Sequence, residues 1–329
     1  MVNVYVARED ATTPDGWTEV AAGYKDKLIL GNGTGLETGG ADTHNHTSMT
    51  GWSASSVTPA SAGSTAGTGS NVIRSGYSHS HIAPASFTCT STNHLPPYKN
   101  FRMLYRDVSG WNFVLPSGSI CYKETTHAKY DRCDDGSSYF LRIAATAGGT
   151  GGATSHNHVA SGNTGVPSGS NITCGTGSED NWYSATHVHS FGFTSSSSTI
   201  SYSYWSCGLV KSNDLTLIVK DLYLWFDGTP PAMFETVTDA TDKYMKVSSD
   251  NSVAYATNSA AHTHTCSGTS GNSSGVAGAN YDTTRVIGDT HTHSISFTLA
   301  SVTPVPSYTR FTLAKTLYDI ANSVIITII

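Results

Sequence analysis

The sequence predicts an all-β protein built from three tandem units, and three observations support this prediction. Twelve of the fourteen histidines fall in six His-x-His triplets, which come as three pairs along the chain. The first triplets of successive pairs begin at His44, His156 and His262, so the pattern repeats after 112 and then 106 residues. Short apolar stretches alternate with polar residues, and no stretch has convincing helical periodicity.

The predicted units are residues 1–113, 114–227 and 228–329. Each is expected to close on an alternating strand, and these strands are 101–104, 215–218 and 311–314. The unit boundaries follow from a match at a constant shift of 114 residues. It relates Arg106, Asp107, Trp111 and Pro116 to Lys220, Asp221, Trp225 and Pro230. Because Trp111 and Trp225 recur in register, we expect both in the core. Residues 308–320 also alternate as a strand.

Segments rich in Gly, Ser and Thr separate the two triplets of each unit, at 47–78, 159–186 and 266–290. Each is bounded by histidines at both ends, so we expect long excursions pinned by metal with little hydrophobic core. The chain also carries an apolar run at 324–329, which would aggregate if it were an exposed strand. We therefore expect it to be covered, closing the third unit onto the start of the first.

The triplets predict metal binding. Side chains at i and i+2 of a strand leave the same face about 7 Å apart, so each triplet aims two imidazoles in one direction. Three triplets around a threefold axis would supply six nitrogens, which suits Fe²⁺ or another octahedral divalent transition metal, two per chain. One predicted centre comprises His44, His46, His156, His158, His262 and His264, and the other comprises His79, His81, His187, His189, His291 and His293.

Two architectures satisfy this pattern. In the favoured one the three units of a single chain surround one axis as an intramolecular pseudo-trimer, elongated and stapled by metal. In the other, three chains intertwine and each triplet meets its own copies. A third interpretation leaves the triplets as solvent-facing polar positions. His94 and His127 have no triplet partner and are expected on the surface.

The six cysteines occupy unmatched positions in the units, so we expect reduced thiols and no threefold disulfide framework. A local pairing of Cys121 with Cys133 stays open. The net charge of −6 and the lack of basic clusters argue against nucleic acid as a partner. No apolar run is long enough for a membrane span, and no signal peptide is evident, so assembly in a cytoplasm is expected.

Several motifs together resemble one family. They are Pro14-Asp15-Gly16-Trp17, Lys27-Leu28-Ile29-Leu30-Gly31, Gly39-Gly40, the His44 and His79 triplets and Pro96-Pro97-Tyr98, partly repeated in the second unit by Gly151-Gly152. The sequence is similar to the tail-collar and long tail-fibre tip family of tailed bacteriophages. That resemblance implies slender intertwined β structure in which three chains each give one His-x-His to an octahedral iron. This chain departs from it by carrying three units, with Gly-Trp and Gly-Gly absent from the third.

We therefore expect a virion structural protein at a tail-fibre tip, tail end or spike, assembled in the host cytoplasm. Its expected partners are other tail or fibre proteins and a host surface receptor such as a glycan. Six histidines leave no open metal position, and no nucleophile or paired-carboxylate motif stands out, so an enzyme is not expected. Candidate receptor-binding aromatics are Trp52, Tyr77, Trp182, Tyr183, Tyr202, Tyr204, Trp205 and Tyr281. The alternative is a purely architectural collar or connector, or the subunit of an extracellular filament.

Overall fold

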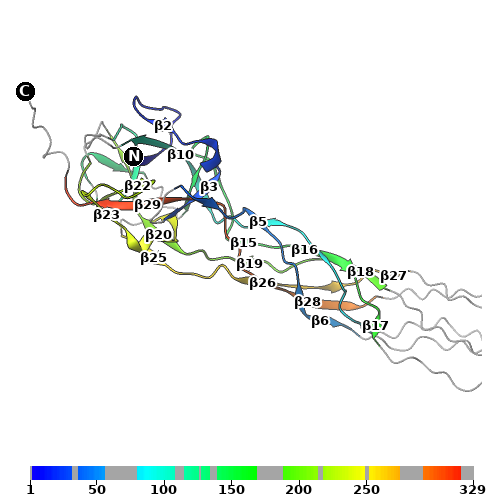
Figure 1. The fold of residues 1–329 in the computed structure, drawn as a ribbon. Helices are drawn as coiled ribbons and strands as arrows, with labels where there is room; N and C mark the ends of the chain where they lie inside the picture. The colour runs from blue at the N-terminus through cyan, green and yellow to red at the C-terminus, as the bar shows by residue number, and fades with distance from the viewer. Residues whose placement is uncertain are drawn as a thin grey trace, which may run out of the picture.

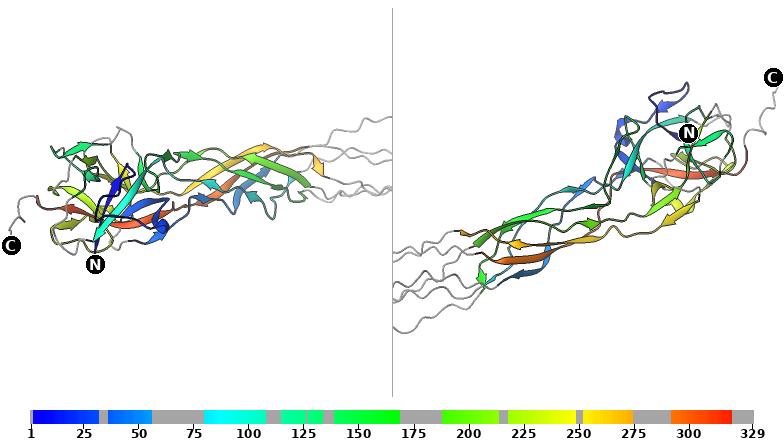
Figure 2. Two further views of the ribbon diagram at one scale, coloured as in Figure 1. Left: turned by 90° about the horizontal axis from the view of Figure 1, so that it is seen from above. Right: turned by 180° about the vertical axis from the view of Figure 1, so that it is seen from behind.

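The computed structural model describes residues 2–31, 36–55, 80–107, 115–125, 127–133, 139–168, 188–213, 218–248, 252–274 and 292–319. Within these ranges the chain forms strands and two short 3-10 turns, and no α-helix, so the all-β prediction is confirmed. A wide head of curved sheet lies at one end, and a slender bundle of extended segments, which we call the shaft, leads away from it (Figures 1 and 2). No helix among the described residues could cross a membrane.

The head is one sixteen-stranded sheet. Its strands are β1 (Asn3–Arg8), β2 (Thr18–Glu19), β3 (Lys27–Gly31), β4 (Thr38–Gly39), β10 (Tyr98–Asp107), β11 (Ile120–Lys123), β12 (Tyr130–Arg132), β13 (Phe140–Ile143), β14 (Thr150–Gly151), β20 (Tyr204–Cys207), β21 (Leu209–Ser212), β22 (Leu222–Phe226), β23 (Phe234–Thr236), β24 (Tyr244–Val247), β25 (Ala254–Ala256) and β29 (Tyr308–Thr316). The two 3-10 turns, η1 (Ala22–Tyr24) and η2 (Thr238–Ala240), also belong to the head.

The shaft consists of small sheets of two to four strands. Its strands are β5 (Thr43–His44), β6 (Met49–Ala54), β7 (Ser80–His81), β8 (Thr88–Cys89), β9 (Thr92–Asn93), β15 (Ser155–His156), β16 (Val159–Asn163), β17 (Pro167–Ser168), β18 (Val188–Thr194), β19 (Ser198–Thr199), β26 (His262–Thr269), β27 (Ser273–Ser274) and β28 (Ser294–Val302).

Strand pairing in the head links the predicted units in a cycle. β13 runs parallel to β10, β24 runs parallel to β20, and β3 runs parallel to β29. Each pairing therefore joins a strand of one unit to the closing strand of another: second to first, third to second, and first to third. β3, β13 and β24 also pair with one another in all three combinations. The three segments consequently meet at the same place in the head.

At two of these junctions between units, a glycine lies against a tyrosine ring of the neighbouring strand. β14 pairs with β10 so that Gly151 faces Tyr98, and β4 pairs with β29 so that Gly39 faces Tyr308. A Cβ on either glycine would lie 2.5 Å from the facing tyrosine oxygen. The third unit has Ala256 opposite Tyr204 instead. The glycines that mark the first two units are therefore required where one unit's strand approaches the aromatic ring of another.

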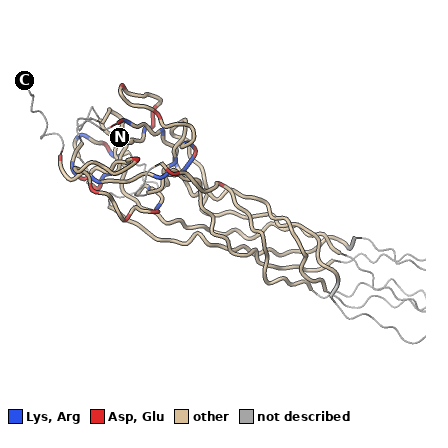
Figure 3. Tube along the Cα trace, in the orientation of Figure 1, with Lys and Arg blue, Asp and Glu red and all other residues tan. Residues whose placement is uncertain are grey.

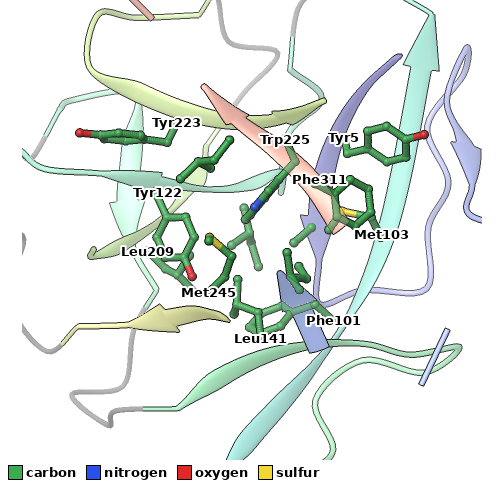
Figure 4. Packing of buried hydrophobic residues seen from close by; sticks show 14 of the residues in the cluster. Tyr5, Phe101, Met103, Tyr122, Leu141, Leu209, Tyr223, Trp225, Met245 and Phe311 are labelled. Carbon is green, nitrogen blue, oxygen red and sulfur yellow. The ribbon is translucent and has the colours of Figure 1, made fainter. Parts of the chain in front are cut away.

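The head core is built from large side chains that point inward from many strands (Figure 4). Trp225 and Trp205 are both fully buried there, and Tyr122 packs edge-on against each of them. The expectation that Trp225 belongs to the core is confirmed, while Trp111 lies outside the described residues. Non-directional burial of this kind provides most of the stabilisation of a β head, at about 25 cal/mol per Å² of apolar surface.

The shaft has a small core of its own, formed mainly by strands that lie outside the Gly/Ser/Thr-rich segments. Phe191 and Phe193 of β18 pack with Phe297 and Ile295 of β28 and with Cys266 of β26. Alternate residues of these strands point inward, as the buried and exposed positions of β18 show. This core could not be predicted from the sequence, because its apolar residues are few and lie among Ser, Thr and Gly.

The described part of the shaft carries almost no charge. Among its described residues, 42–55, 80–97, 153–168, 188–203, 257–274 and 292–307, Asp42 is the only charged side chain. Lysine, arginine, aspartate and glutamate are concentrated in the head (Figure 3). Any ion in the shaft would therefore be held by neutral donors.

The strands expected at 215–218 and at 308–320 have different outcomes. The segment 215–218 was predicted to close the second unit, but β20 makes the equivalent parallel pairing, and Ile218 lies buried outside any strand. Residues 214–217 lie outside the described residues. The strand expected at 308–320 is present as β29, Tyr308–Thr316. The apolar run 324–329 and its predicted ring closure also lie outside the described residues.

The described cysteines, Cys89, Cys121, Cys133, Cys207 and Cys266, are all free thiols. The local bond between Cys121 and Cys133 that the sequence left open is therefore not formed. Burial raises the pKa of the Cys207 thiol to about 12, which makes it an inert structural group at neutral pH.

Candidate metal centres

The histidines of the three first triplets converge where the shaft leaves the head. His44 lies on β5, His156 on β15 and His262 on β26, and each triplet extends two residues further along the shaft. Short ladders hold these segments: His44 is opposite Thr92, His156 opposite Ser198 and His262 opposite Val302. Segments more than 100 residues apart in the sequence are thus brought around one point.

The six rings form two triangles. His44, His156 and His262 make the triangle nearer the head, with ring centroids 4.8 to 4.9 Å apart. His46, His158 and His264 make the second, with centroids 4.8 to 5.1 Å apart. We call this set of six residues the first centre.

The two triangles are staggered. His44 contacts the rings of His46 and His158, His156 contacts those of His158 and His264, and His262 contacts those of His264 and His46. Each ring of one triangle therefore touches two rings of the other and stands opposite the third. This is the relation among the six vertices of an octahedron.

Backbone carbonyls fix the orientation of the second triangle. Nδ1 of His46 lies 2.6 Å from the Ala300 oxygen, Nδ1 of His158 lies 2.7 Å from the Thr90 oxygen, and Nδ1 of His264 lies 2.8 Å from the Ser196 oxygen. A carbonyl only accepts, so each Nδ1–H donates and each Nε2 keeps its lone pair. Such outer hydrogen bonds are the usual way a protein sets the tautomer of a metal-binding histidine.

Four of the six Nε2 atoms are then left without partners. Those of His46, His156, His158 and His264 are buried and make no hydrogen bond. Nε2 of His44 lies 3.1 Å from Nε2 of His262. A buried nitrogen lone pair without a donor is costly. A cation at the middle of the cluster would satisfy all of these atoms at once.

The spacing fits such a cation. Ligand nitrogens within the overlapping groups His44, His156, His158, His262 and His46, His158, His262, His264 all lie within 4.8 Å of one another. With a metal–nitrogen bond of about 2.1 Å, an octahedral shell has neighbouring nitrogens about 3 Å apart and opposite ones about 4 Å apart. The buried cluster can therefore hold a metal ion. Its all-imidazole donor set suits a transition metal rather than Ca²⁺ or Mg²⁺, which prefer oxygen.

The local environment favours the neutral form of five of these imidazoles. Burial is the main cause that lowers the pKa of His44 to about 2, of His156 to about 3 and of His158 to about 4, and neighbouring histidines add to it. Burial also lowers the pKa of His262 and of His264. Neutral imidazole is the form that binds metal, so the apo protein is ready for it at neutral pH.

A second cluster lies farther along the shaft. His81, His189 and His293 are buried, with ring centroids 4.7 to 4.8 Å apart, and their ligand nitrogens also lie within 4.8 Å. Each Nδ1 faces a backbone oxygen, from Gly165, Gly271 and Ser55 respectively, at 2.7 to 2.9 Å. The cluster can therefore also hold a metal ion. His79, His187 and His291, the other predicted members, lie outside the described residues.

His94 does not lie on the surface as expected. It is 4% exposed, and its Nδ1 lies 3.2 Å from Nδ1 of His44. No sequence pattern indicated this position, because His94 is neither in a triplet nor repeated in the other units. His127, the other histidine without a triplet partner, is exposed as expected.

The described receptor candidates are mostly packed within the fold. Tyr202 is 5% exposed and Trp205 fully buried, so the expectation that they stand on exposed loops is wrong. Trp52 belongs to the shaft and donates from Nε1 to the His81 oxygen. Tyr204 is half-buried under the Lys246 ammonium. The candidates Tyr77, Trp182, Tyr183 and Tyr281 lie outside the described residues.

Comparison with known proteins adds no identity: no family model, no curated protein and no solved structure matches this chain. The geometry of the histidine clusters is therefore the main evidence on function.

Acid should weaken the metal-free fold. The folded pKa of His44, His156 and His158 lies below the ordinary value of 6.5. Between those values the unfolded chain binds more protons, so stability rises with pH. We expect the melting temperature of chelator-treated protein to be constant above about pH 6.5 and to fall steadily toward pH 4. Replacing His127 should leave the profile unchanged, whereas a flat profile in the wild type would contradict this burial of neutral imidazoles.

Proposed function

We propose that this chain is a metal-stapled structural protein of a virus particle, at a tail-fibre tip, tail end or spike. The observation that carries the proposal is the first centre. Histidines from all three units point their Nε2 atoms at one place, while backbone carbonyls hold Nδ1 of the second triangle. The resemblance of the triplets and their flanking Gly-Gly and Pro-Pro-Tyr motifs to long tail-fibre tips supplies the biological setting.

The proposed architecture is a trimer fused into one polypeptide. A single chain supplies all six histidines of the first centre. The parallel pairings β10–β13, β20–β24 and β29–β3 link the units in a closed cycle. Both features favour an intramolecular pseudo-trimer over three intertwined chains, because neither requires a second copy.

We propose Fe²⁺, or another divalent metal that favours six ligands, in each of two centres per chain. Zn²⁺ usually takes four ligands and fits six converging imidazoles less well. A shell of six histidines leaves no position for water or substrate, so the metal would stabilise the shaft and not catalyse a reaction. The first centre would lock the shaft to the head, and the second would hold the shaft farther out.

Receptor binding remains part of the proposal, but a purely architectural role has a specific observation in its favour. Tyr202 and Trp205 are packed into the fold and offer no aromatic face to a glycan. A receptor site would therefore use other surfaces, whereas a collar, connector or filament subunit needs none. The proposed partners are other tail or fibre proteins and, in the receptor-binding case, a host surface receptor.

The double variant His156→Ala, His158→Ala tests the architecture and the metal together. In a pseudo-trimer it removes two ligands of one of two centres, so up to half of the bound metal should be lost, as measured by elemental analysis. In an intertwined homotrimer it removes all ligands of one centre in six, and about a sixth should be lost. His127→Ala is the control and should lose none.

Solution mass completes that test. A 34.7 kDa particle that loses about half its metal agrees with the proposal. A particle of three chains that loses about a sixth would contradict the fused trimer. Wild-type protein with less than about one metal per chain would contradict the metal role itself.

The viral setting has its own test. Antibodies against the purified chain should label one end of the tail or its fibres in negative-stain images of particles from the source. Pre-adsorption of the antibodies with purified protein is the control. Labelling that is absent from particles, or confined to the capsid, would contradict a tail position and favour a filament or another assembly.

A further inference from the structure

A seventh histidine lies beside the first centre. The Nδ1 atoms of His94 and His44 are 3.2 Å apart, and the two ring centroids are 4.9 Å apart at 72°. The His94 backbone is held from two directions, since its N–H donates to the Asp42 oxygen and its carbonyl accepts from the Tyr202 hydroxyl. The His94 backbone is therefore fixed, and its side chain is buried beside His44.

This residue breaks the threefold pattern. The ladders that place Thr92 opposite His44, Ser198 opposite His156 and Val302 opposite His262 also align the residues that follow. The positions equivalent to His94 are then Ile200 and Pro304, neither of which can accept a side-chain hydrogen bond. The first unit alone has an imidazole there.

The three histidines of the triangle nearer the head consequently differ in what supports them. Nδ1 of His262 lies 3.0 Å from the Ala260 oxygen, two residues away in its own strand. Nδ1 of His44 faces a side chain instead. The second triangle, in contrast, uses a backbone oxygen from an equivalent position each time.

The direction of the His44–His94 hydrogen bond follows from the role of His44. Nε2 of His44 points at Nε2 of His262 inside the centre, so His44 is neutral with its proton on Nδ1 when it binds metal. Nδ1–H of His44 then donates, and Nδ1 of His94 accepts.

We propose that His94 is a positioning residue of the first centre, which accepts the Nδ1–H of His44 and so directs the Nε2 of His44 to the metal. The proposal rests on the proposed metal role of that centre. An outer hydrogen bond of this kind orients the ring and raises its basicity as a ligand. Without it His44, one of the two partly exposed rings of the six, could rotate away from the centre.

Two substitutions separate hydrogen bonding from packing. His94→Ile places the residue of the equivalent second-unit position there, fills the space and accepts no hydrogen bond. His94→Asn offers an amide oxygen close to the position of Nδ1. His127→Ala is the control, because it removes an exposed histidine of the head. The probe is Co²⁺ added to chelator-treated protein, with affinity measured by competition against a chelator of known strength.

We expect His94→Ile to weaken Co²⁺ binding at the first centre by about 10- to 100-fold, the usual effect of losing an outer-shell partner. His94→Asn should recover most of that loss, and His127→Ala should have no effect. The first centre is recognised as the binding phase that His156→Ala, His158→Ala removes. In proton spectra of the Co²⁺ form, one shifted imidazole N–H should move or exchange faster in His94→Ile but not in His94→Asn.

Unchanged Co²⁺ affinity in His94→Ile would overturn the proposal, and so would equal weakening by Ile and Asn, which would indicate packing alone. If His94→Ile does not fold, the Asn variant decides: wild-type affinity supports the hydrogen bond, and weakened affinity overturns it. Failure of the metal role is distinguishable, because the wild type itself would then lack the first binding phase.

Discussion

The burial of six imidazoles around one point is the constraint on which the rest of the structure depends. The rings lose water on burial, and the Nε2 atoms of four of them, His46, His156, His158 and His264, gain no hydrogen bond from the protein in exchange. Such an arrangement needs the backbone to hold the rings, and an ion that satisfied the lone pairs would stabilise it further. The Nδ1 bonds to Ala300, Thr90 and Ser196 provide the backbone support. The proposed metal would be the ion.

The arrangements of the head and of the shaft both relate to this cluster of six imidazoles. The cyclic strand pairing in the head brings three distant segments to the same place, so that their triplets leave it side by side. Farther along, Phe191, Phe297 and Cys266 pack between the two histidine clusters. The shaft thus alternates a polar cluster, an apolar core and a second polar cluster. With Asp42 as the only charge among its described residues, it has no ion pairs of its own to compete for a cation.

The clusters could be predicted from the sequence because a spacing of two residues places both side chains on the same face of a strand. His44 and His46 must share a face of any strand, and the recurrence in three units indicated that the faces meet. The second cluster is found for His81, His189 and His293 only, as the described residues include no more of it. The carbonyls that orient the rings were unpredictable, since a backbone oxygen has no side-chain signature. His94 was missed for a related reason, as a single histidine carries no pattern.

The closing strand of the second unit was misplaced because different parts of that unit align with the first unit at two different sequence offsets. A shift of 114 residues matches Trp111 to Trp225 and pointed to 215–218. The ladders instead relate Thr92 to Ser198 and place β20 in that role, a shift of 106. Apolar alternation alone could not choose between them, because both segments are short and the deciding interaction is a parallel pairing with a distant strand.

X-ray absorption at the metal edge of the reconstituted protein tests the central claim most directly. The proposed function predicts six nitrogen ligands in one shell at about 2.1 Å, with the outer scattering of imidazole rings. The sample should be the single 34.7 kDa chain, with its mass checked in the same buffer. A four-coordinate shell, or one that includes oxygen or sulfur ligands, would contradict a closed centre made by the six histidines of the three units.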